Sequence, residues 1–264
     1  MKLRSTPGTV RVGPLRPKGP HEINLTHHIL ALMILLVTPC VQAEEVAMLP
    51  QLSAGERANW QAVGLLSKTG SQSGKGCTAT LIAPDKVLTA AHCVANRAGY
   101  SGPAEELQFK AGQNGTKVAA TRYGKRVAVH PIYGITKGVE KAAYDVAIVW
   151  LNRPIGADVA APLPLSTQLD AGPPLAVLGY QQRNRDVLNG RFDCDVTISR
   201  SFVYQLGCHV ISGNSGGPVL QRAEDGWQLV GVVSAKTGVA GPGRAIVVPI
   251  GQWVLHQLDT PRTN

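Results

Sequence analysis

The chain has 264 residues and a mass of 27.9 kDa, which suits one large domain or two of ordinary size. Hydrophobic residues make up 44% and charged residues 16%, a composition that excludes an intrinsically disordered chain. The net charge is +9, but residues 1–43 hold five of the basic residues and only one acidic residue. The remainder is mildly basic and has no Lys/Arg run with interleaved aromatic residues, so we expect no nucleic-acid partner.

The N-terminal segment carries the pattern of a secretory signal. Basic residues precede a nine-residue apolar run at 29–37, and a membrane-spanning helix needs about 20 residues. Val41 and Ala43 then provide the small residues of a signal-peptidase site. We predict that residues 1–43 are a signal peptide and that the protein is secreted or periplasmic, without stable membrane insertion after cleavage. A short uncleaved anchor, or a lipoprotein formed on Cys40, remains the alternative.

Cleavage at this site would leave four cysteines in an exported chain. An even number favours two disulfides over metal ligation, and three pairings are possible. Pairing each cysteine with its sequence neighbour would close loops of about 15 residues, each contributing roughly 3 kcal/mol to stability. The sequence has no C-x-x-C or H-x-x-x-H motif, so we expect neither a metal nor another cofactor. The four residues are Cys77, Cys93, Cys194 and Cys208.

Short apolar runs bounded by turn residues continue along the chain. They predict hairpins at 78–91 and 219–234, and further strands at 126–130, 146–151, 175–178 and 245–250. Only 251–258 has the apolar spacing of a helix. The glycines and prolines, 29 and 18 in number, also indicate many short strands and turns.

The segment 154–174 is rich in Pro and Ala and divides the mature chain into halves of comparable length. Each half has room for about six short strands, so we predict an all-β fold of two six-stranded antiparallel barrels with a C-terminal helix. We assign 44–59 to an N-terminal extension, 60–258 to the folded body and 259–264 to a tail. A monomer is expected.

Three motifs carry candidate chemistry. Ser215 lies in GNSGGP, where glycines permit a tight turn and allow the N–H groups of Gly213 and Ser215 to converge as an oxyanion hole. His92, in TAAHC, ends a predicted strand beside a cysteine and has the pKa range of a general base. Asp145 heads the apolar run DVAIVWL, where a buried carboxylate would orient an imidazole. The alternatives are a glycine turn, a core histidine and a capped strand end.

Together and in this order, the motifs resemble those of the chymotrypsin-fold serine peptidases. The resemblance covers residues 60–258 and implies two six-stranded barrels with the active site between them. It implies Ser215 as nucleophile, His92 as general base and acid, and Asp145 as the residue that orients His92. The pair Cys77–Cys93 matches the family disulfide that braces the histidine loop.

Specificity is inferred from the positions around the predicted cleft. Ser234 matches a family serine that hydrogen-bonds the catalytic aspartate and lines the cleft. Asn214 stands where animal trypsins have the Asp that pairs with a new N-terminus, so we infer that activity does not need that ion pair. His209 stands where trypsins have their Lys/Arg-selecting Asp, and we place it in the substrate pocket. Lys236 would occlude the pocket or bind an acidic side chain, as in the glutamyl-endopeptidase branch, although Val233 replaces that branch's usual His.

These observations lead to one principal hypothesis and two alternatives. The principal one is a secreted serine endopeptidase that acts on polypeptides through an acyl-enzyme on Ser215. A non-catalytic binding protein on the same fold is the first alternative. The second is a small-ester hydrolase with the same site but a poor peptide cleft. An edge strand at 234–237 would favour the peptidase.

Overall fold

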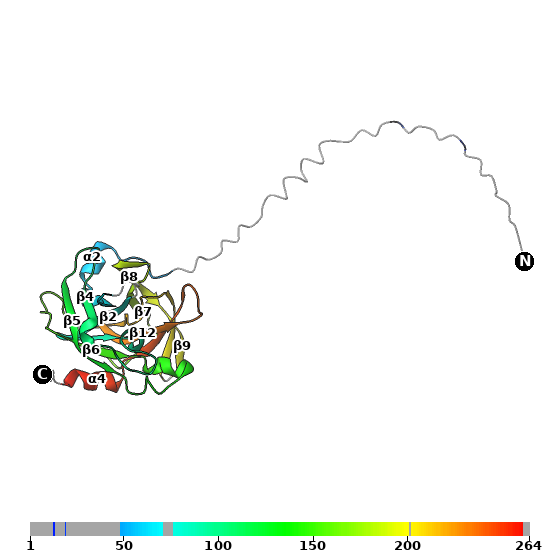
Figure 1. Ribbon diagram of the computed structural model, residues 1–264. Helices are drawn as coiled ribbons and strands as arrows, with labels where there is room; N and C mark the ends of the chain where they lie inside the picture. Colours follow the sequence, from blue (N-terminus) through cyan, green and yellow to red (C-terminus); the bar gives the residue numbers. More distant parts are fainter. Residues whose placement is uncertain (1–12, 14–18, 20–47, 71–75, 201, 261–264) are drawn as a thin grey trace, which may run out of the picture. The chain divides into compact units, whose positions relative to one another are not determined.

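Thirteen strands lie among the residues that the computed structural model describes, which are 13, 19, 48–70, 76–200 and 202–260 (Figure 1). The described residues from Met48 onward belong to one compact unit. The predicted signal peptide at 1–43, apart from residues 13 and 19, lies outside the described residues, and so do residues 261–264 of the predicted tail.

The first half of this unit is a closed barrel of six antiparallel strands. Their order around the barrel is β1 (Val63–Lys68), β2 (Gly76–Ala83), β3 (Lys86–Thr89), β6 (Ala147–Leu151), β5 (Ala120–Val129) and β4 (Leu107–Ala111). Buried aliphatic side chains such as Leu81, Val87 and Val149 fill one core cluster of this half. Because β-branched and leucine side chains alternate inward along these strands, closure buries them without leaving an open edge.

The second half is an antiparallel sheet of seven strands. Their order is β8 (Asn184–Cys194), β7 (Leu175–Gln181), β11 (Pro218–Ala223), β12 (Gly226–Lys236), β13 (Gly243–Pro249), β10 (Val203–Val210) and β9 (Val196–Arg200). The all-β class with a six-stranded barrel and a second sheet is therefore confirmed, and the second half has one strand more than the sequence predicts. Side chains of this sheet form a second core cluster, which includes Val177, Val219 and Val247.

A third cluster joins the two halves. It includes Leu88 and Trp150 from the barrel and Leu178 and Leu220 from the sheet. Residues 154–174 connect β6 to β7 and, as described, contain no helix or strand beyond an isolated bridge at Leu165. The two halves are thus packed against each other, and the loops at their junction are held in place.

The helices are few and short. The described α-helices are α2 (Ala54–Ala58), α3 (Ala91–Val94) and α4 (Gln252–Asp259), and the 3₁₀ helices are η2 (Ala104–Glu106) and η3 (Gly138–Tyr144). The predicted C-terminal helix is confirmed as α4, whose Val254 is buried in the cluster that joins the halves. No helix among the described residues is both long enough and apolar enough to cross a membrane.

Candidate active site

His92 lies on the one-turn helix α3, not at the end of the preceding strand as the sequence predicts. Strand β3 ends at Thr89, because from Ala91 the backbone is helical and Cys93 and Ala95 donate to the carbonyls of Ala90 and Ala91. Because of this turn, the main-chain N–H and the imidazole of His92 both contact Asp145. His92 N donates to Asp145 Oδ1 at 2.8 Å, and His92 Nδ1 lies 2.7 Å from Asp145 Oδ2.

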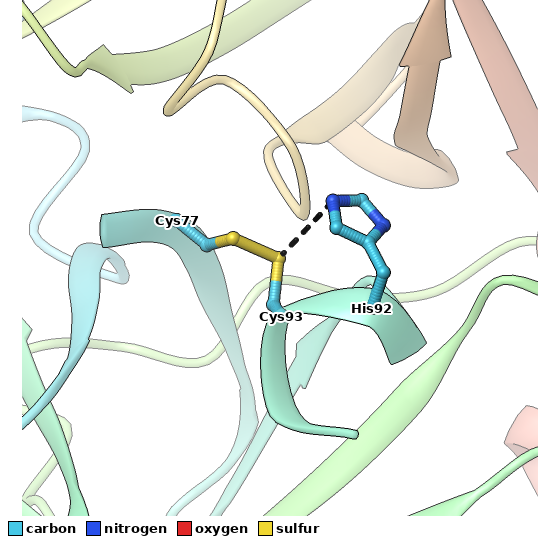
Figure 2. A group of neighbouring side chains, drawn as sticks. All are labelled: Cys77, His92 and Cys93. Carbon is cyan, nitrogen blue, oxygen red and sulfur yellow. Dashed lines mark hydrogen bonds between the residues drawn. A yellow bond between two sulfur atoms is a disulfide. The ribbon is translucent and has the colours of Figure 1, made fainter. Parts of the chain in front are cut away.

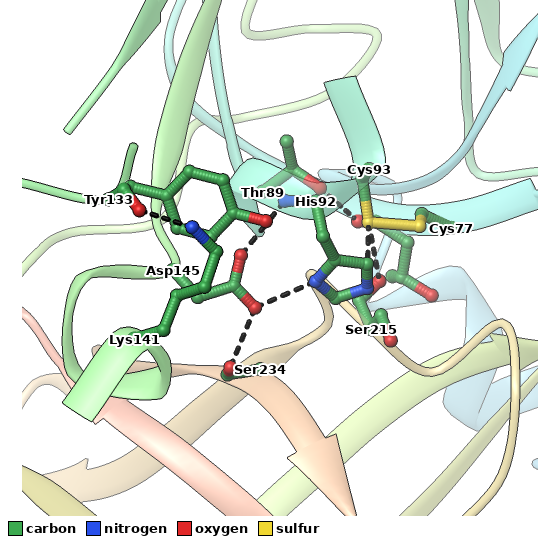
Figure 3. A network of polar contacts seen from close by, with 10 residues as sticks. Cys77, Thr89, His92, Cys93, Tyr133, Lys141, Asp145, Ser215 and Ser234 are labelled. Carbon is green, nitrogen blue, oxygen red and sulfur yellow. Dashed lines mark hydrogen bonds and ion pairs between the residues drawn. A yellow bond between two sulfur atoms is a disulfide. The ribbon is translucent and has the colours of Figure 1, made fainter. Parts of the chain in front are cut away.

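Asp145 follows η3 and is only 5% exposed. Besides the two contacts with His92, its Oδ2 accepts a hydrogen bond from Ser234 Oγ at 2.7 Å. An ionised carboxylate has no donor, so the hydrogen at the shared contact belongs to His92 Nδ1. The neutral imidazole therefore has its lone pair on Nε2. Figure 3 shows Asp145 at one nitrogen of the ring and Ser215 beside the other.

The charge on Asp145 controls the basicity of His92. Withdrawal of water from the ring lowers the pKa of His92, but the hydrogen bond and the negative charge of Asp145 outweigh this and leave the pKa above its ordinary value of 6.5. The imidazole side chain remains 39% exposed, at the surface of a cleft. The ring is thus held by the protein on one side and accessible to a substrate on the other.

Ser215 is carried by a loop that only glycines allow. Gly213 and Gly216 have positive φ angles of 102° and 79°. A Cβ atom on Gly213 would lie 2.6 Å from Gln182 N, and one on Gly216 would lie 2.1 Å from Thr78 O. Both the backbone conformation and the close packing exclude larger residues. The predicted tight turn of GNSGGP is therefore present.

The N–H groups of this loop fall into two sets. Those of Asn214, Gly216 and Gly217 donate to the carbonyls of Ile211, Val233 and Asn214. The N–H groups of Gly213 and Ser215 donate to no acceptor among the described residues. Two unpaired N–H groups beside a half-buried serine that lines the cleft are what an oxyanion site requires. Within the same residues no hydrogen bond joins Ser215 Oγ to His92 Nε2, and such bonds are often long before substrate binds.

Asn214 is fully buried, and main-chain groups satisfy its amide. Its Oδ1 accepts from Ile211 N at 2.9 Å, and its Nδ2 donates to Tyr180 O at 3.1 Å. A neutral side chain at this position needs no counter-ion, so its burial carries no charge-desolvation cost.

Both disulfides pair sequence neighbours, Cys77 with Cys93 and Cys194 with Cys208. Cys93 Sγ lies 3.8 Å from both His92 Nε2 and Ser215 O, so the first disulfide packs against the site (Figure 2). The atoms of Cys77, His92 and Cys93 that could ligate a metal lie within 4.8 Å of one another. The sulfurs are bonded to each other, however, and offer no thiolate to a zinc ion.

A cleft of about 400 Å³ runs along the junction of the two halves. It is lined by His92, by the loop from Tyr133 to Asp145, by residues 210–212 with Ser215, and by the end of β12 at 233–236. A second hollow of about 380 Å³ begins on the other side of His92 and reaches Lys68 and Tyr100. His92 thus lines both hollows.

His209 does not line this cleft. It lies on β10, opposite Arg244 of β13, and Met48 forms a bridge beside it. Cys208 and Val210, its two neighbours, are buried in the core cluster of the sheet, so strand alternation turns His209 to the opposite face. The predicted pocket residues Ser234 and Lys236 do line the cleft.

Tyr133 and Lys141 line the cleft but were not among the predicted site residues. Lys141 Nζ donates to the carbonyls of Tyr133 and Arg97, the latter at 2.8 Å, and lies 3.7 Å from the centre of the Tyr133 ring. Burial, reinforced by the charge of Asp145, raises the pKa of Tyr133 to about 12. Tyr133 lies in a turn and Lys141 in the short 3₁₀ helix η3, and neither stretch has apolar periodicity, so no sequence pattern marked them.

Comparisons with known proteins agree with this geometry. The family model described as Trypsin matches residues 52–254. The chain belongs to the trypsin family. A protein named "Trypsin" from Saccharopolyspora erythraea is 29% identical over 221 residues, which cover 72% of this chain and 88% of that protein.

The fold has a solved counterpart. A structure titled as Glu endopeptidase in complex with MPD aligns with a TM-score of 0.63 at 21% identity, covering 81% of this chain and 96% of that one. As a member of the trypsin family, the chain is a serine-type endopeptidase. The two disulfides fit an extracellular or periplasmic protein.

Proposed function

We propose that this protein is an exported serine endopeptidase that cleaves polypeptides through an acyl-enzyme on Ser215. One observation carries the proposal. The His92 ring is fixed through Nδ1 by the buried Asp145, and its Nε2 faces the side on which Ser215 and two unpaired main-chain N–H groups meet the cleft. This arrangement provides a base, a nucleophile and an oxyanion site at one place.

In the proposed reaction, Ser215 Oγ attacks the carbonyl carbon while His92 Nε2 takes the hydroxyl proton. The negative oxygen accepts hydrogen bonds from Gly213 N and Ser215 N, and Asp145 stabilises the imidazolium. His92 then gives its proton to the amine as the C–N bond breaks, leaving the acyl-enzyme. Water then attacks the ester carbonyl while His92 Nε2 takes a proton from it, and His92 returns that proton to Ser215 Oγ as the C–O bond breaks, releasing the acid and free Ser215.

The end of β12 supports a peptide substrate over a small ester. Its pairing with β11 ends at Val232, whereas its pairing with β13 continues to Lys236. Residues 234–236 therefore pair on one side only, beside the cleft. An extended peptide could join this free edge by strand addition.

The first test is labelling with a fluorophosphonate probe, followed by mass-spectrometric mapping and reporter assays. We expect modification of Ser215, none in Ser215→Ala, and turnover of peptide as well as ester reporters. Turnover of esters alone would overturn the endopeptidase proposal in favour of an esterase. A folded protein that neither labels nor turns over reporters would favour the binding protein.

We propose further that the cleft prefers an acidic residue before the scissile bond. Lys236 lines the cleft, and its Nζ makes only long contacts of 3.4 and 3.3 Å to Gly238 O and Val239 O. The one acidic lining residue, Asp145, is already bonded to His92 and Ser234. The structural neighbour titled Glu endopeptidase fits this preference. Residue 233 departs from that branch, since it is Val where the branch usually has His.

A panel of Glu, Asp, Leu, Ala and Arg reporters would test this preference. We expect Glu or Asp to be favoured, and Lys236→Ala to reduce turnover of the Glu reporter with little effect on the Leu reporter. Equal turnover of all reporters, or an unchanged Glu preference in Lys236→Ala, would contradict it.

Export is the remaining part of the proposal, with cleavage after Ala43 and a mature chain that starts at Glu44. N-terminal sequencing of protein recovered from the medium or the periplasm would test it. A chain recovered with residues 1–43 attached would contradict cleavage at this site.

A further inference from the structure

Residues 48–52 lie along the second half of the molecule and are bonded to it at several points. Met48 bridges His209 of β10, and Gln51 bridges Asn189 of β8. Pro50 O accepts from Gly190 N at 2.9 Å, and Leu52 N donates to Leu188 O at 3.2 Å. We call residues 48–52 the strap.

Apolar packing anchors the strap as well. Leu49 is 3% exposed and belongs to the core cluster of the sheet, and Leu52 is 4% exposed and belongs to the cluster that joins the halves. A Cβ atom on Gly190 would lie only 3.1 Å from Leu52 Cδ2, so the strand backbone approaches the strap closely. Burial on this scale is typical of a permanent part of a fold, not of a removable segment.

Gln181 connects the strap to the loop that carries Ser215. Its side chain is 6% exposed, and Nε2 donates to Leu49 O at 2.9 Å. Its backbone lies against Gly213, because a Cβ atom on Gly213 would be 3.0 Å from Gln181 C. The next residue, Gln182, donates its N–H to Ser212 O at 2.8 Å. The segment 180–182 thus contacts the strap through the Gln181 side chain and the loop that carries Ser215 through its backbone.

The same segment also holds Asn214, the neighbour of the nucleophile. Asn214 Nδ2 donates to Tyr180 O at 3.1 Å. No charged group takes part in these contacts, and none of them involves a chain terminus. The loop is therefore supported, through residues 180–182, by an N-terminal segment that makes only uncharged contacts.

We propose that the strap is an integral part of the catalytic domain, and that Gln181 is a positioning residue that transmits its support to the oxyanion N–H of Gly213. The proposal rests on the proposed function of Ser215. It predicts that removal of the N-terminal extension through Leu52 lowers activity instead of releasing it. Residues 48–52 are accordingly not a removable propeptide.

The test compares Gln181→Leu with Gln51→Ala in the otherwise unaltered chain. Leucine keeps most of the volume but loses the donor to Leu49 O, whereas Gln51 is exposed and serves as the matched control. We expect Gln181→Leu to lower kcat and the fluorophosphonate labelling rate by about tenfold to a hundredfold, because an oxyanion donor is displaced. KM should change little. Gln51→Ala should stay within about twofold of the parent in both.

A second readout does not depend on activity. Amide hydrogen exchange of residues 211–217 should be faster in folded Gln181→Leu and unchanged in Gln51→Ala. If residues 211–217 exchange faster in Gln181→Leu than in the parent, but the parent is never labelled at Ser215, the proposed function fails while the role of the strap is supported. A folded Gln181→Leu with parental labelling and parental exchange would overturn the proposal.

Mass spectrometry of the labelled species tests the integrity of the strap directly. We expect every molecule labelled at Ser215 to retain residues 48–52. Labelled molecules that begin after Leu52 would overturn the proposal.

Discussion

The two halves of the molecule hold their parts of the candidate site in different ways. In the barrel half, His92 and Asp145 are fixed by hydrogen bonds to each other, and Ser234 completes the set from the sheet half. In the sheet half, Ser215 is placed by a backbone path that requires Gly213 and Gly216. Substitutions in the first group should alter charge and proton position, whereas substitutions in the second should alter geometry.

The largest expected effect comes from the charge of Asp145. Asp145→Asn keeps the size of the side chain, but its amide can donate to Nδ1 and so favour the wrong imidazole tautomer. We expect kcat on a peptide reporter to fall by about 10⁴-fold. Thermal unfolding of the variant should show that it is still folded at the assay temperature, so that the loss of activity is not a loss of structure. A fall of less than tenfold would show that Asp145 does not orient the base.

The geometric half is tested by Gly216→Ala, with Gly241→Ala as control. Both glycines have positive φ angles, 79° at Gly216 and 66° at Gly241. A Cβ atom on Gly216 would lie 2.1 Å from Thr78 O, whereas a Cβ atom on Gly241 would extend into open space. We expect about 1 kcal/mol of destabilisation at 241 from backbone strain alone. At 216 the clash should add several-fold to this cost and reduce kcat by about 10²–10³.

Urea unfolding and reporter kinetics would measure both variants. Equal losses of stability at the two positions would mean that the loop around Ser215 is no more tightly packed than an open surface turn.

The two disulfides sharpen the comparison further. Their loops are similar in length, with sequence separations of 16 and 14, so replacing either pair by serines should cost about 3 kcal/mol of unfolding free energy. Only Cys77–Cys93 packs against His92 and Ser215. We therefore expect its removal to lower kcat in the folded protein, whereas removal of Cys194–Cys208 should leave kcat nearly unchanged. Equal kcat values would contradict a role for the first disulfide in bracing His92.

The smallest effect is a shift in the titration of His92. Asp145 holds the pKa of His92 above its ordinary value, so labelling of Ser215 should fall as the pH drops through a midpoint above 6.5. A raised folded-state pKa also means that the His92–Asp145 pair stabilises the fold fully below the unfolded pKa. That contribution is lost as the pH rises through the folded pKa.

NMR titration of the imidazole in the parent and in Asp145→Asn would check the sign. The midpoint should move below 6.5 in the variant, since only the effect of burial remains. An unchanged midpoint would remove Asp145 as the cause.

Much of the fold was predictable because its signals are local. The hairpins β2–β3 and β11–β12 have apolar runs on either side of turn residues, and the structure contains both. Strands β1, β4, β8, β9 and β10 have no counterpart among the predicted strands. The three consecutive buried residues of β8 are Leu188, Asn189 and Gly190, and only the first has an apolar side chain, so the strand has no clear alternation. Its pairing with β7 is a local hairpin in which Gln181 lies opposite Asn184, but the two turn residues, Gln182 and Arg183, include no Gly, Pro, Asn or Asp that would mark a turn in the sequence.

The candidate site divides in the same way. The residues that meet at the junction, His92, Asp145 and Ser215, each lie in a short motif. His209 was placed in the pocket by counting back from Ser215, but its facing depends on the pairing of β10, which the count does not contain. Lys141, on the 3₁₀ helix η3, is held at the cleft by the carbonyl and the ring of Tyr133 in the preceding turn, a contact that no sequence pattern marks.

The neutral, fully satisfied Asn214 has a consequence for how such an enzyme is kept in check. If the strap supports this loop as proposed, the loop would be competent as soon as the chain has folded around it. Restraint would then depend on when and where folding is completed, not on a later cut. Because Cys77–Cys93 packs against His92, a reducing compartment that keeps these thiols unpaired would also withhold this support from the site.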